Sequence, residues 1–290
     1  MSDTLQLLFS GLGTGSIYAL VALGFNIIFK STGALNFAQG EWVMVGGMVA
    51  ATLYAAGVPL VGAFVAATLV AMAVGALSER LAVRRLKRAD PMSITILTIA
   101  IAICTKSLVI LVLGKNWAGL PSFSPQGPIS LGGAVFESQS LWIIGIAAVV
   151  MAGAGYFFNR TTLGKAMRAA AAQPEAAALV GISPRLTMAL SFTLAAGVGA
   201  VAGVIVTPLT LTSFDHGTIL GFKAFCAAML GGLGSLPGAM VGGLVLGLAE
   251  SLAGGMLSSH FKDAVAFVVL LAVLVKWRNG LLGRGQVERV

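Results

Sequence analysis

Long apolar runs recur along the chain and are separated by short segments that hold most of its charged and helix-breaking residues. A helix needs about 20 mostly apolar residues to cross a hydrocarbon core of roughly 30 Å. The runs are continuous instead of alternating at every second position, which favours helices over a membrane β-barrel. We expect nine spans, near Leu5–Phe29, Asn36–Ala56, Leu60–Glu79, Met92–Leu113, Ser140–Phe158, Leu186–Pro208, Thr218–Gly232, Pro237–Met256 and Lys262–Lys276.

The region after Pro208 is compatible with more than one number of crossings. The runs at 218–232 and 262–276 are short for a span, and the stretch from Gly231 to Gly238 holds enough helix breakers for a re-entrant half-helix. We therefore predict an all-α, polytopic transmembrane helix bundle of about eight to ten spans. No connector is long enough to fold alone, so we expect a single membrane domain over residues 1–290.

Composition and charge support a membrane protein. Charged residues form 10% of the chain and hydrophobic residues 58%, whereas about 25% of the residues in a soluble domain are charged. The net charge of +8 comes from Lys and Arg in the connectors, so topology explains it without a nucleic-acid partner. These residues are Arg80, Arg84, Arg85, Lys87, Arg88, Arg160, Lys165, Arg168, Arg185, Lys276, Arg278, Arg284 and Arg289. Basic connectors face the cytoplasm, which predicts an external N-terminus, an external loop at 114–139 and a cytoplasmic C-terminus.

Glycine spacing predicts both helix packing and one break. Three pairs separated by four positions allow helices to approach closely in lipid: Gly199 with Gly203, Gly238 with Gly242, and Gly243 with Gly247. The stretch 231–238 is different, because so many helix breakers in an apolar region indicate unwound backbone that faces protein or water. Its candidate pathway or gate residues are Gly232, Gly234, Ser235 and Pro237.

Polar residues within the apolar runs allow two interpretations. Asn36, Gln39 and Glu41 precede the run that starts at Trp42, so they either cap that helix or line a translocation pathway or gate. Lys106 is close enough to the outer end of its helix for its ammonium to snorkel to the surface. Lys223 and Glu250 are either interhelical contacts or pathway residues.

Motifs for chemistry are missing from the sequence. It has no Walker A pattern, so we expect this chain neither to hydrolyse ATP by that route nor to bind a cofactor. His216 and His260 are far apart in sequence, and Cys104 and Cys226 lie in apolar runs as inert thiols. We therefore predict neither catalytic residues nor a metal site.

The connector at about 159–185 is predicted to be helical and cytoplasmic. It is rich in alanine, and Gln173-Pro174 ends one short helix and begins the next. A channel without a nucleotide site could dock this basic loop into an ATPase subunit. The alternative is a connector lying at the lipid headgroups.

Four blocks resemble a known family: GSIYALVALGFNIIF at 15–29, GALNFAQGEWVMVGG at 33–47, GKAMRAAAAQPEAAALVGI at 164–182 and FKAFCAAMLGGLGSLPGAMVGGLVLGLAES at 222–251. They are similar to permease subunits of branched-chain amino acid ABC importers, a family that includes urea and amide permeases. The resemblance implies four partners: a second homologous permease, two cytoplasmic ATPases and an extracytoplasmic solute-binding protein. It also implies that the loop couples to the ATPases through Gly164, Arg168, Glu175 and Gly181, with Ala169 and Ala176 at close-packing positions.

Two positions depart from the family pattern. Gln39 stands where many relatives have His, which argues against a proton-linked role there. The tail from Lys276 to Gly280 lacks the proline common at that point, so the geometry of its turn is open.

The predicted function is import of branched-chain amino acids or similar small polar solutes across the bacterial cytoplasmic (inner) membrane. Partner ATPases would drive alternating access. The same complex type importing urea, short amides or aromatic acids is the first alternative. A stand-alone secondary transporter or channel is the second, and it would need ionisable residues at mid-depth. A membrane-embedded enzyme would need convergent acid, base or nucleophilic groups, and the sequence offers no such set.

Overall fold

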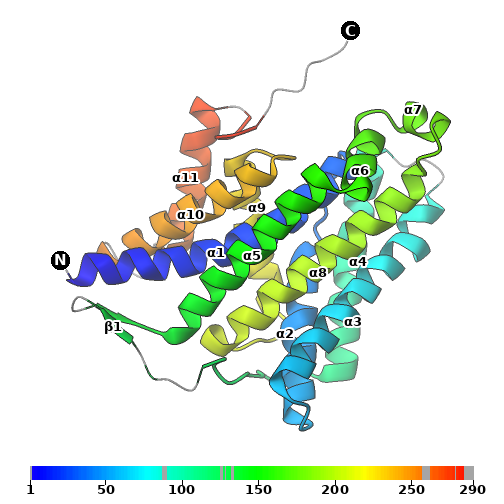
Figure 1. Ribbon diagram of the computed structural model, residues 1–290. Coiled ribbons are helices and arrows are strands. Elements are labelled where there is room, and N and C mark those ends of the chain that lie inside the picture. Colours follow the sequence, from blue (N-terminus) through cyan, green and yellow to red (C-terminus); the bar gives the residue numbers. More distant parts are fainter. Residues whose placement is uncertain are drawn as a thin grey trace.

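The computed structural model describes residues 2–86, 90–124, 127, 129–131, 134–256, 262–277 and 279–283. The chain forms a bundle of long helices that run between two ends (Figure 1). Its helices are α1 (Ser2–Thr32), α2 (Gln39–Ala55), α3 (Leu60–Leu81), the 3-10 turn η1 (Val83–Arg85), α4 (Pro91–Leu113), α5 (Ser138–Arg160), α6 (Thr162–Ala172), α7 (Pro174–Leu179), α8 (Pro184–Thr210), α9 (His216–Gly231), α10 (Leu236–Met256) and α11 (Lys262–Lys276). A small antiparallel hairpin, β1 (Ile129–Leu131) and β2 (Ala134–Phe136), lies in the loop before α5.

Each of the nine expected spans coincides with a helix, and the all-α, polytopic prediction is confirmed. Among the described residues, six helices are long and apolar enough to cross a membrane: α1, α3, α4, α5, α8 and α10. The other three are shorter, with 17 residues in α2, 16 in α9 and 15 in α11. The count of eight to ten spans and the absolute orientation stay predictions. The hairpin was not predicted from the sequence.

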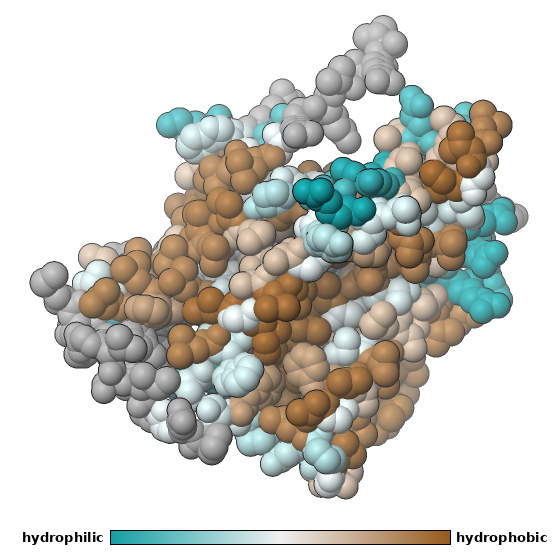
Figure 2. Space-filling model, in the orientation of Figure 1, coloured by the Kyte–Doolittle hydropathy of each residue, from teal (hydrophilic) through white to brown (hydrophobic). Residues whose placement is uncertain are grey.

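The helices differ in how much of their apolar surface the bundle covers. In α1, 83% of the most apolar 18-residue stretch is buried inside the bundle, whereas only 22% of the corresponding stretch is buried in each of α3, α4 and α5. α1 packs along α10, α8 and α9, and α2 is enclosed by α3, α8 and α9. The outer helices present apolar side chains such as Val61, Leu111 and Val149 to the surroundings, and brown apolar residues cover much of the face in Figure 2. Those faces are suited to lipid or to a partner subunit.

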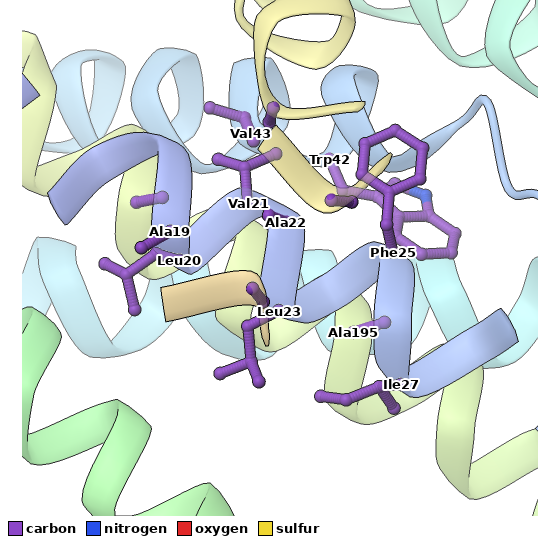
Figure 3. Close-up of a cluster of buried hydrophobic side chains, with 14 of the residues drawn as sticks. Ala19, Leu20, Val21, Ala22, Leu23, Phe25, Ile27, Trp42, Val43 and Ala195 are labelled. Atoms are coloured by element: carbon purple, nitrogen blue, oxygen red, sulfur yellow. The ribbon is translucent and has the colours of Figure 1, made fainter. Parts of the chain in front are cut away.

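Glycines bring the central helices into close contact, as their spacing predicted. A Cβ at Gly243 or Gly247 of α10 would clash with α1 at Ala19 or Gly15, and one at Gly203 of α8 would clash with α2. The core around these contacts is apolar (Figure 3): Phe25 of α1 lies beside Trp42 of α2, and Leu20 and Leu23 are buried elsewhere along α1. Close backbone packing thus replaces the hydrophobic drive that is missing between helices in lipid.

The basic connectors lie at one end of the bundle, as the positive-inside rule predicted. The η1 turn and the α6–α7 segment are together at the upper right of Figure 1, where teal residues gather in Figure 2. The β1–β2 hairpin lies at the opposite end, beside the start of α1. We call these the basic end and the hairpin end.

Candidate functional site

The segment between α1 and α2, residues 33–38, is irregular yet enters the bundle. Backbone at membrane depth must be hydrogen-bonded by protein or water. Two α4 hydroxyls meet this need, because Leu35 N–H donates to Thr95 Oγ1 at 3.2 Å and Phe37 N–H donates to Thr98 Oγ1 at 3.1 Å. The segment is therefore a supported break between two helices.

The α2 helix begins deep inside the bundle. Gln39, fully buried, donates from Nε2 to the carbonyl of Ala195 at 3.0 Å, and Ala195 lies close to the midpoint of α8. A Cβ at Gly40 would meet the carbonyl of Gly217, so the first turns of α2 and α9 touch. Two helix N-termini thus meet in the interior, an arrangement used by transporters to bind polar solutes.

Buried polar atoms without a hydrogen-bond partner concentrate at this break. Within the described residues there are five such side-chain atoms: Asn36 Nδ2, Gln39 Oε1, Glu41 Oε2, Trp42 Nε1 and Arg168 Nε. Four of them fall in seven consecutive residues. Each orphaned group costs free energy unless water or a solute binds to it.

Capping of the α2 helix accounts for only some of the contacts of these polar side chains. The residue before α2 is Ala38, whose side chain cannot cap, and Asn36 Oδ1 accepts from the Ala38 N–H at 3.2 Å just ahead of the helix. Glu41 does lie in the first turn. Neither arrangement gives a partner to Asn36 Nδ2 or to Glu41 Oε2.

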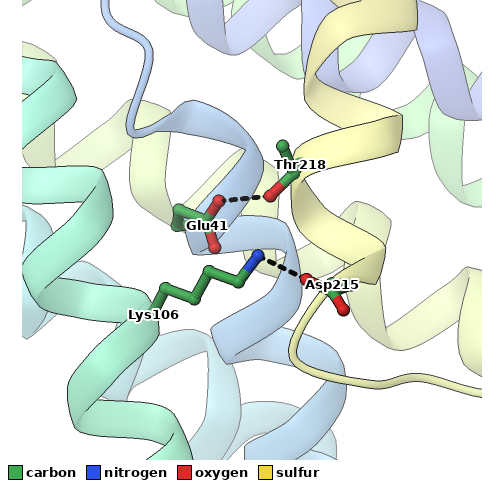
Figure 4. Close-up of polar contacts among 4 residues, drawn as sticks. All are labelled: Glu41, Lys106, Asp215 and Thr218. Atoms are coloured by element: carbon green, nitrogen blue, oxygen red, sulfur yellow. Dashed lines mark hydrogen bonds and ion pairs between the residues drawn. The ribbon is translucent and has the colours of Figure 1, made fainter.

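Glu41 belongs to a charged cluster formed by three helices (Figure 4). Its Oε1 accepts a hydrogen bond from Thr218 Oγ1 at 2.9 Å, and Lys106 of α4 forms an ion pair with Asp215, the residue before α9. Lys106 Nζ also lies 5.4 Å from the centre of the Phe214 ring. The sequence favoured snorkelling for this lysine, and in the structure its ammonium pairs with Asp215 while both side chains stay partly exposed, at 29% and 55%.

A second charged group is fully matched. Lys223 of α9 forms an ion pair with Glu250 of α10, and Tyr18 Oη donates to the other Glu250 oxygen at 2.6 Å. These residues also line a cavity of about 560 Å³ that is shared with α5 and α8. The interhelical contact that the sequence allowed is therefore present, and a role in the translocation pathway stays a prediction.

The α6–α7 segment at the basic end forms two short helices separated at Gln173-Pro174, as predicted. Thr161 Oγ1 accepts from the Gly164 N–H at 3.0 Å and so caps α6. A Cβ at Gly164 would clash with the Phe157 carbonyl, so this glycine lets α6 turn tightly against the end of α5. Motion of α6 would therefore be transmitted to α5.

The alanines of this segment differ in how far they are buried within the chain. Ala169 and Ala176 are exposed, whereas the neighbouring Ala170 and Ala177 are each 4% exposed. Within the chain, the packed faces of the two helices therefore include Ala170 and Ala177, and the close-packing role of Ala169 and Ala176 stays a prediction. Other exposed residues of the segment are Glu175, Leu179, Val180 and Gly181, and Gly181 adopts a positive φ of 83°.

One predicted coupling residue and three predicted gate residues line the same cavity. A cavity of about 780 Å³ at the basic end is lined by Arg168 of α6, by Gly234 and Ser235 between α9 and α10, and by Pro237 in the first turn of α10. Gly232 is close by, but it packs against the Gly283 backbone. Asn36, Gln39 and Glu41 do not line this cavity, so the predicted pathway residues form two separate groups.

Asn26 is a residue that sequence reasoning missed. It is fully buried in α1, donates from Nδ2 to the Ser235 carbonyl at 2.9 Å and accepts from the Gly234 N–H at 3.0 Å. An amide inside an apolar run was the available signal. Residues 232–235 are a tight turn between two helices, and the Asn26 side chain hydrogen-bonds to one backbone N–H and one backbone carbonyl of this turn.

The tail after α11 closes the same turn. Leu281 N–H donates to the Leu230 carbonyl at 2.8 Å, and Leu282 N–H donates to the Gly231 carbonyl at 3.0 Å. The sequence left the geometry of this turn open because the family's proline is missing, and in the structure Gly280 makes the bend with a φ of 77°. Several residues used in the sequence argument lie outside the described part of the chain: His260, Lys87, Arg88, Arg278, Arg284 and Arg289.

The geometry defines a multi-pass membrane protein with helix breaks, internal cavities and a short helical segment projecting at its basic end. A family model described as the permease component of the branched-chain amino acid transport system matches residues 7–274. The chain belongs to this family.

Individual relatives agree with the family model. LivH, the permease protein of the high-affinity branched-chain amino acid transport system of Escherichia coli (strain K12), is 37% identical over 302 residues, which cover 99% of this chain and 97% of LivH. BraD of Pseudomonas aeruginosa, a permease protein of the same kind of system, is 37% identical over 300 residues, covering 99% and 98%. The ribose import permease protein RbsC of E. coli (strain K12) is 26% identical over 94% of this chain and 86% of RbsC.

A solved structure shares the fold. PsaBC from Streptococcus pneumoniae in complex with Fab contains a chain that aligns with a TM-score of 0.50 and 13% identity, covering 91% of this chain and 90% of that one. Together the comparisons confirm the prediction of a permease subunit of an ATP-binding cassette importer. The protein is thus a membrane-embedded transport component of a multi-subunit complex.

Proposed function

We propose that this permease imports branched-chain amino acids across the bacterial cytoplasmic membrane. The observation that carries the proposal is the 37% identity to LivH and BraD over nearly the whole of each chain. The identity to the ribose permease is lower, at 26%. Urea, short amides and aromatic acids are the competing solutes.

The import is driven by two cytoplasmic ATPase subunits that bind ATP and Mg²⁺, and this chain performs no catalysis. A second homologous permease completes the membrane part, and an extracytoplasmic binding protein delivers the solute. Support for ATPase docking comes from the α6–α7 segment, where Leu179 and Val180 are 89% and 75% exposed beside Glu175. Apolar side chains exposed next to charges at the end of a bundle are typical of a protein interface.

Coupling then follows a physical connection. The tight packing at Gly164 joins α6 to α5, and Arg168 faces the cavity that holds the 232–235 turn. An ATPase that moves α6 would therefore shift both α5 and the wall of this cavity. Alternating access needs such a rigid link between the motor and the solute path.

The test is L-leucine uptake by proteoliposomes that hold the complete complex. Replacement of both Arg168 and Glu175 by Ala should reduce L-leucine uptake at least about tenfold, as expected for lost interface contacts. In the same variant, transport should no longer stimulate ATP hydrolysis by the ATPase subunits. Lys115→Ala, an exposed change after α4 at the other end of the bundle, is the matched control and should keep the wild-type rate. Wild-type uptake and ATPase stimulation by the double variant would contradict the coupling assignment.

A further inference from the structure

We propose that the cavity between α2, α4 and α9 binds a zwitterionic α-amino acid with an apolar side chain, through Glu41 to its ammonium group and Lys106 to its carboxylate. The cavity has a volume of about 470 Å³, which is within the range of small-molecule sites. It is lined by residues of α1, α2, α4 and α9 and by Phe37 before α2. The inference rests on the proposed function, and it assigns the recognition of the solute within the membrane to named side chains.

The first step is the unmatched carboxylate. Glu41 is 5% exposed and lines the cavity, and Thr218 occupies its Oε1. Its Oε2 has no hydrogen-bond partner. A buried carboxylate oxygen in this state is costly, and a cationic donor offsets the cost most effectively. An ammonium group is such a donor.

The second step is the fixed cation. Lys106 lines the same cavity, and Figure 4 shows its ammonium and the Glu41 carboxylate pointing into the same space. Lys106 and Asp215 are also close enough to Glu41 to interact with it electrostatically. The ion pair with Asp215 holds Lys106 in place and uses one of three ammonium hydrogens, which leaves others for a carboxylate.

The third step is the remaining wall. Apart from Glu41, Lys106 and Thr218, the lining consists of glycine backbone and apolar side chains: Phe25, Phe37, Ile99, Ala102, Ile103 and Phe222. A sugar or an amide would find few polar partners there. A branched aliphatic side chain between two opposite charges matches this lining, because it buries its carbons while both charged ends are paired.

The fourth step is the position of the site. The first turns of α2 and α9 meet beside it, through the contact of Gly40 with Gly217. Broken helices whose N-termini meet inside the bundle are a way to place polar groups around a solute in a membrane. The unwound segment 33–38 supplies the break, and α4 supplies both the supporting hydroxyls and Lys106.

The main experiment measures L-leucine uptake by the reconstituted complex. Glu41→Gln keeps the shape and the bond to Thr218 but removes the charge, so uptake should fall at least about tenfold, as for the loss of a charged hydrogen bond. Lys106→Met should reduce uptake similarly. The matched control is Glu79→Gln, which neutralises another buried carboxylate. Glu79 lies in α3, is 3% exposed and does not line this cavity. This control should retain wild-type uptake.

A second measurement detects occupancy without transport. A thiol reagent is applied to complexes with the background changes Cys104→Ser and Cys226→Ala. One complex carries Ala102→Cys, which lines the cavity, and the other carries Ile96→Cys, which is exposed on the same helix but does not line the cavity. L-Leucine should slow the labelling at position 102 at least about threefold and not at position 96. The analogue 4-methylpentanoate, which lacks the ammonium group, should not protect.

The outcomes separate the two proposals. Wild-type uptake by Glu41→Gln, or labelling at position 102 that L-leucine leaves unchanged, would overturn the inference while the proposed function stands. Unprotected labelling is also the result expected if a lipid chain fills the cavity. If the wild-type complex takes up no L-leucine at all, the proposed function fails, and the inference fails with it.

Discussion

The two irregular segments inside the bundle, residues 33–38 and 232–235, are supported in different ways. At 232–235, Asn26 bonds to both sides of the turn, and the tail bonds to the end of α9. At 33–38, α4 hydroxyls bind the backbone, but three polar side chains at or just beyond the break keep atoms without partners: Asn36, Gln39 and Glu41. The first segment is a closed structural joint, whereas the second leaves polar groups available for water or solute.

The buried carboxylates show the same contrast. Glu250 is matched by Lys223 and Tyr18, whereas Glu41 has only Thr218 on one oxygen. A matched buried pair becomes strongly unfavourable when one partner is removed. A buried carboxylate that forms no ion pair contributes little stability, and we take the role of Glu41 to be binding.

Removal of the matched carboxylate should have the largest effect on stability. Glu250→Gln breaks the ion pair with Lys223 and should lower the unfolding free energy by about 3 kcal/mol. The measurement is the apparent melting temperature of the purified complex. Glu41→Gln is the comparison and should change stability by less than about 0.5 kcal/mol. Equal losses in the two variants would remove the distinction between the carboxylates.

Loss of the turn support should come next. Asn26→Leu leaves the Gly234 N–H and the Ser235 carbonyl without their partner, and it should cost about 2 kcal/mol. Asn159→Leu, at an exposed position of α5, should cost less than about 0.5 kcal/mol. The same melting assay reads both variants. A stable Asn26→Leu protein would show that the turn does not depend on this side chain.

The supporting hydroxyl of α4 should have the smallest effect. Thr98→Val removes the acceptor for the Phe37 N–H and should cost about 1 kcal/mol. Because segment 33–38 leads into the site, we also expect weaker L-leucine protection at position 102. Thr105→Val, a buried change two turns further along α4, is the control for altered packing. If both threonine variants behave alike, the hydroxyl does not position the segment.

Apolar runs and basic connectors were sufficient to predict most of the fold. Their lengths located all nine long helices, because a bilayer demands continuous apolar surface. The glycine pairs predicted the close contacts of α10 with α1 and of α8 with α2. The β1–β2 hairpin escaped prediction, because its strands are only three residues long and carry no strong alternating pattern.

The site was only half predictable. The local sequence around Glu41 identified polar residues in an apolar run, but their partners lie far away, with Thr218 177 positions further along the chain. Asn26 meets the 232–235 turn across a separation of 208 and 209 residues. Such pairings depend on how the helices pack, which a single sequence does not reveal. The burial of Ala170 and Ala177 was equally unpredictable, because a nearly uniform alanine helix does not show which face is buried.

The most direct test of the account is whether ATP hydrolysis by partner subunits drives solute uptake through this chain. Proteoliposomes are prepared with the permease pair alone and with the complete complex, and L-leucine uptake is measured with ATP or with a nonhydrolysable analogue. The account predicts uptake only in the complete complex with ATP. Uptake by the permease pair alone, or at equal rates with the analogue, would contradict it.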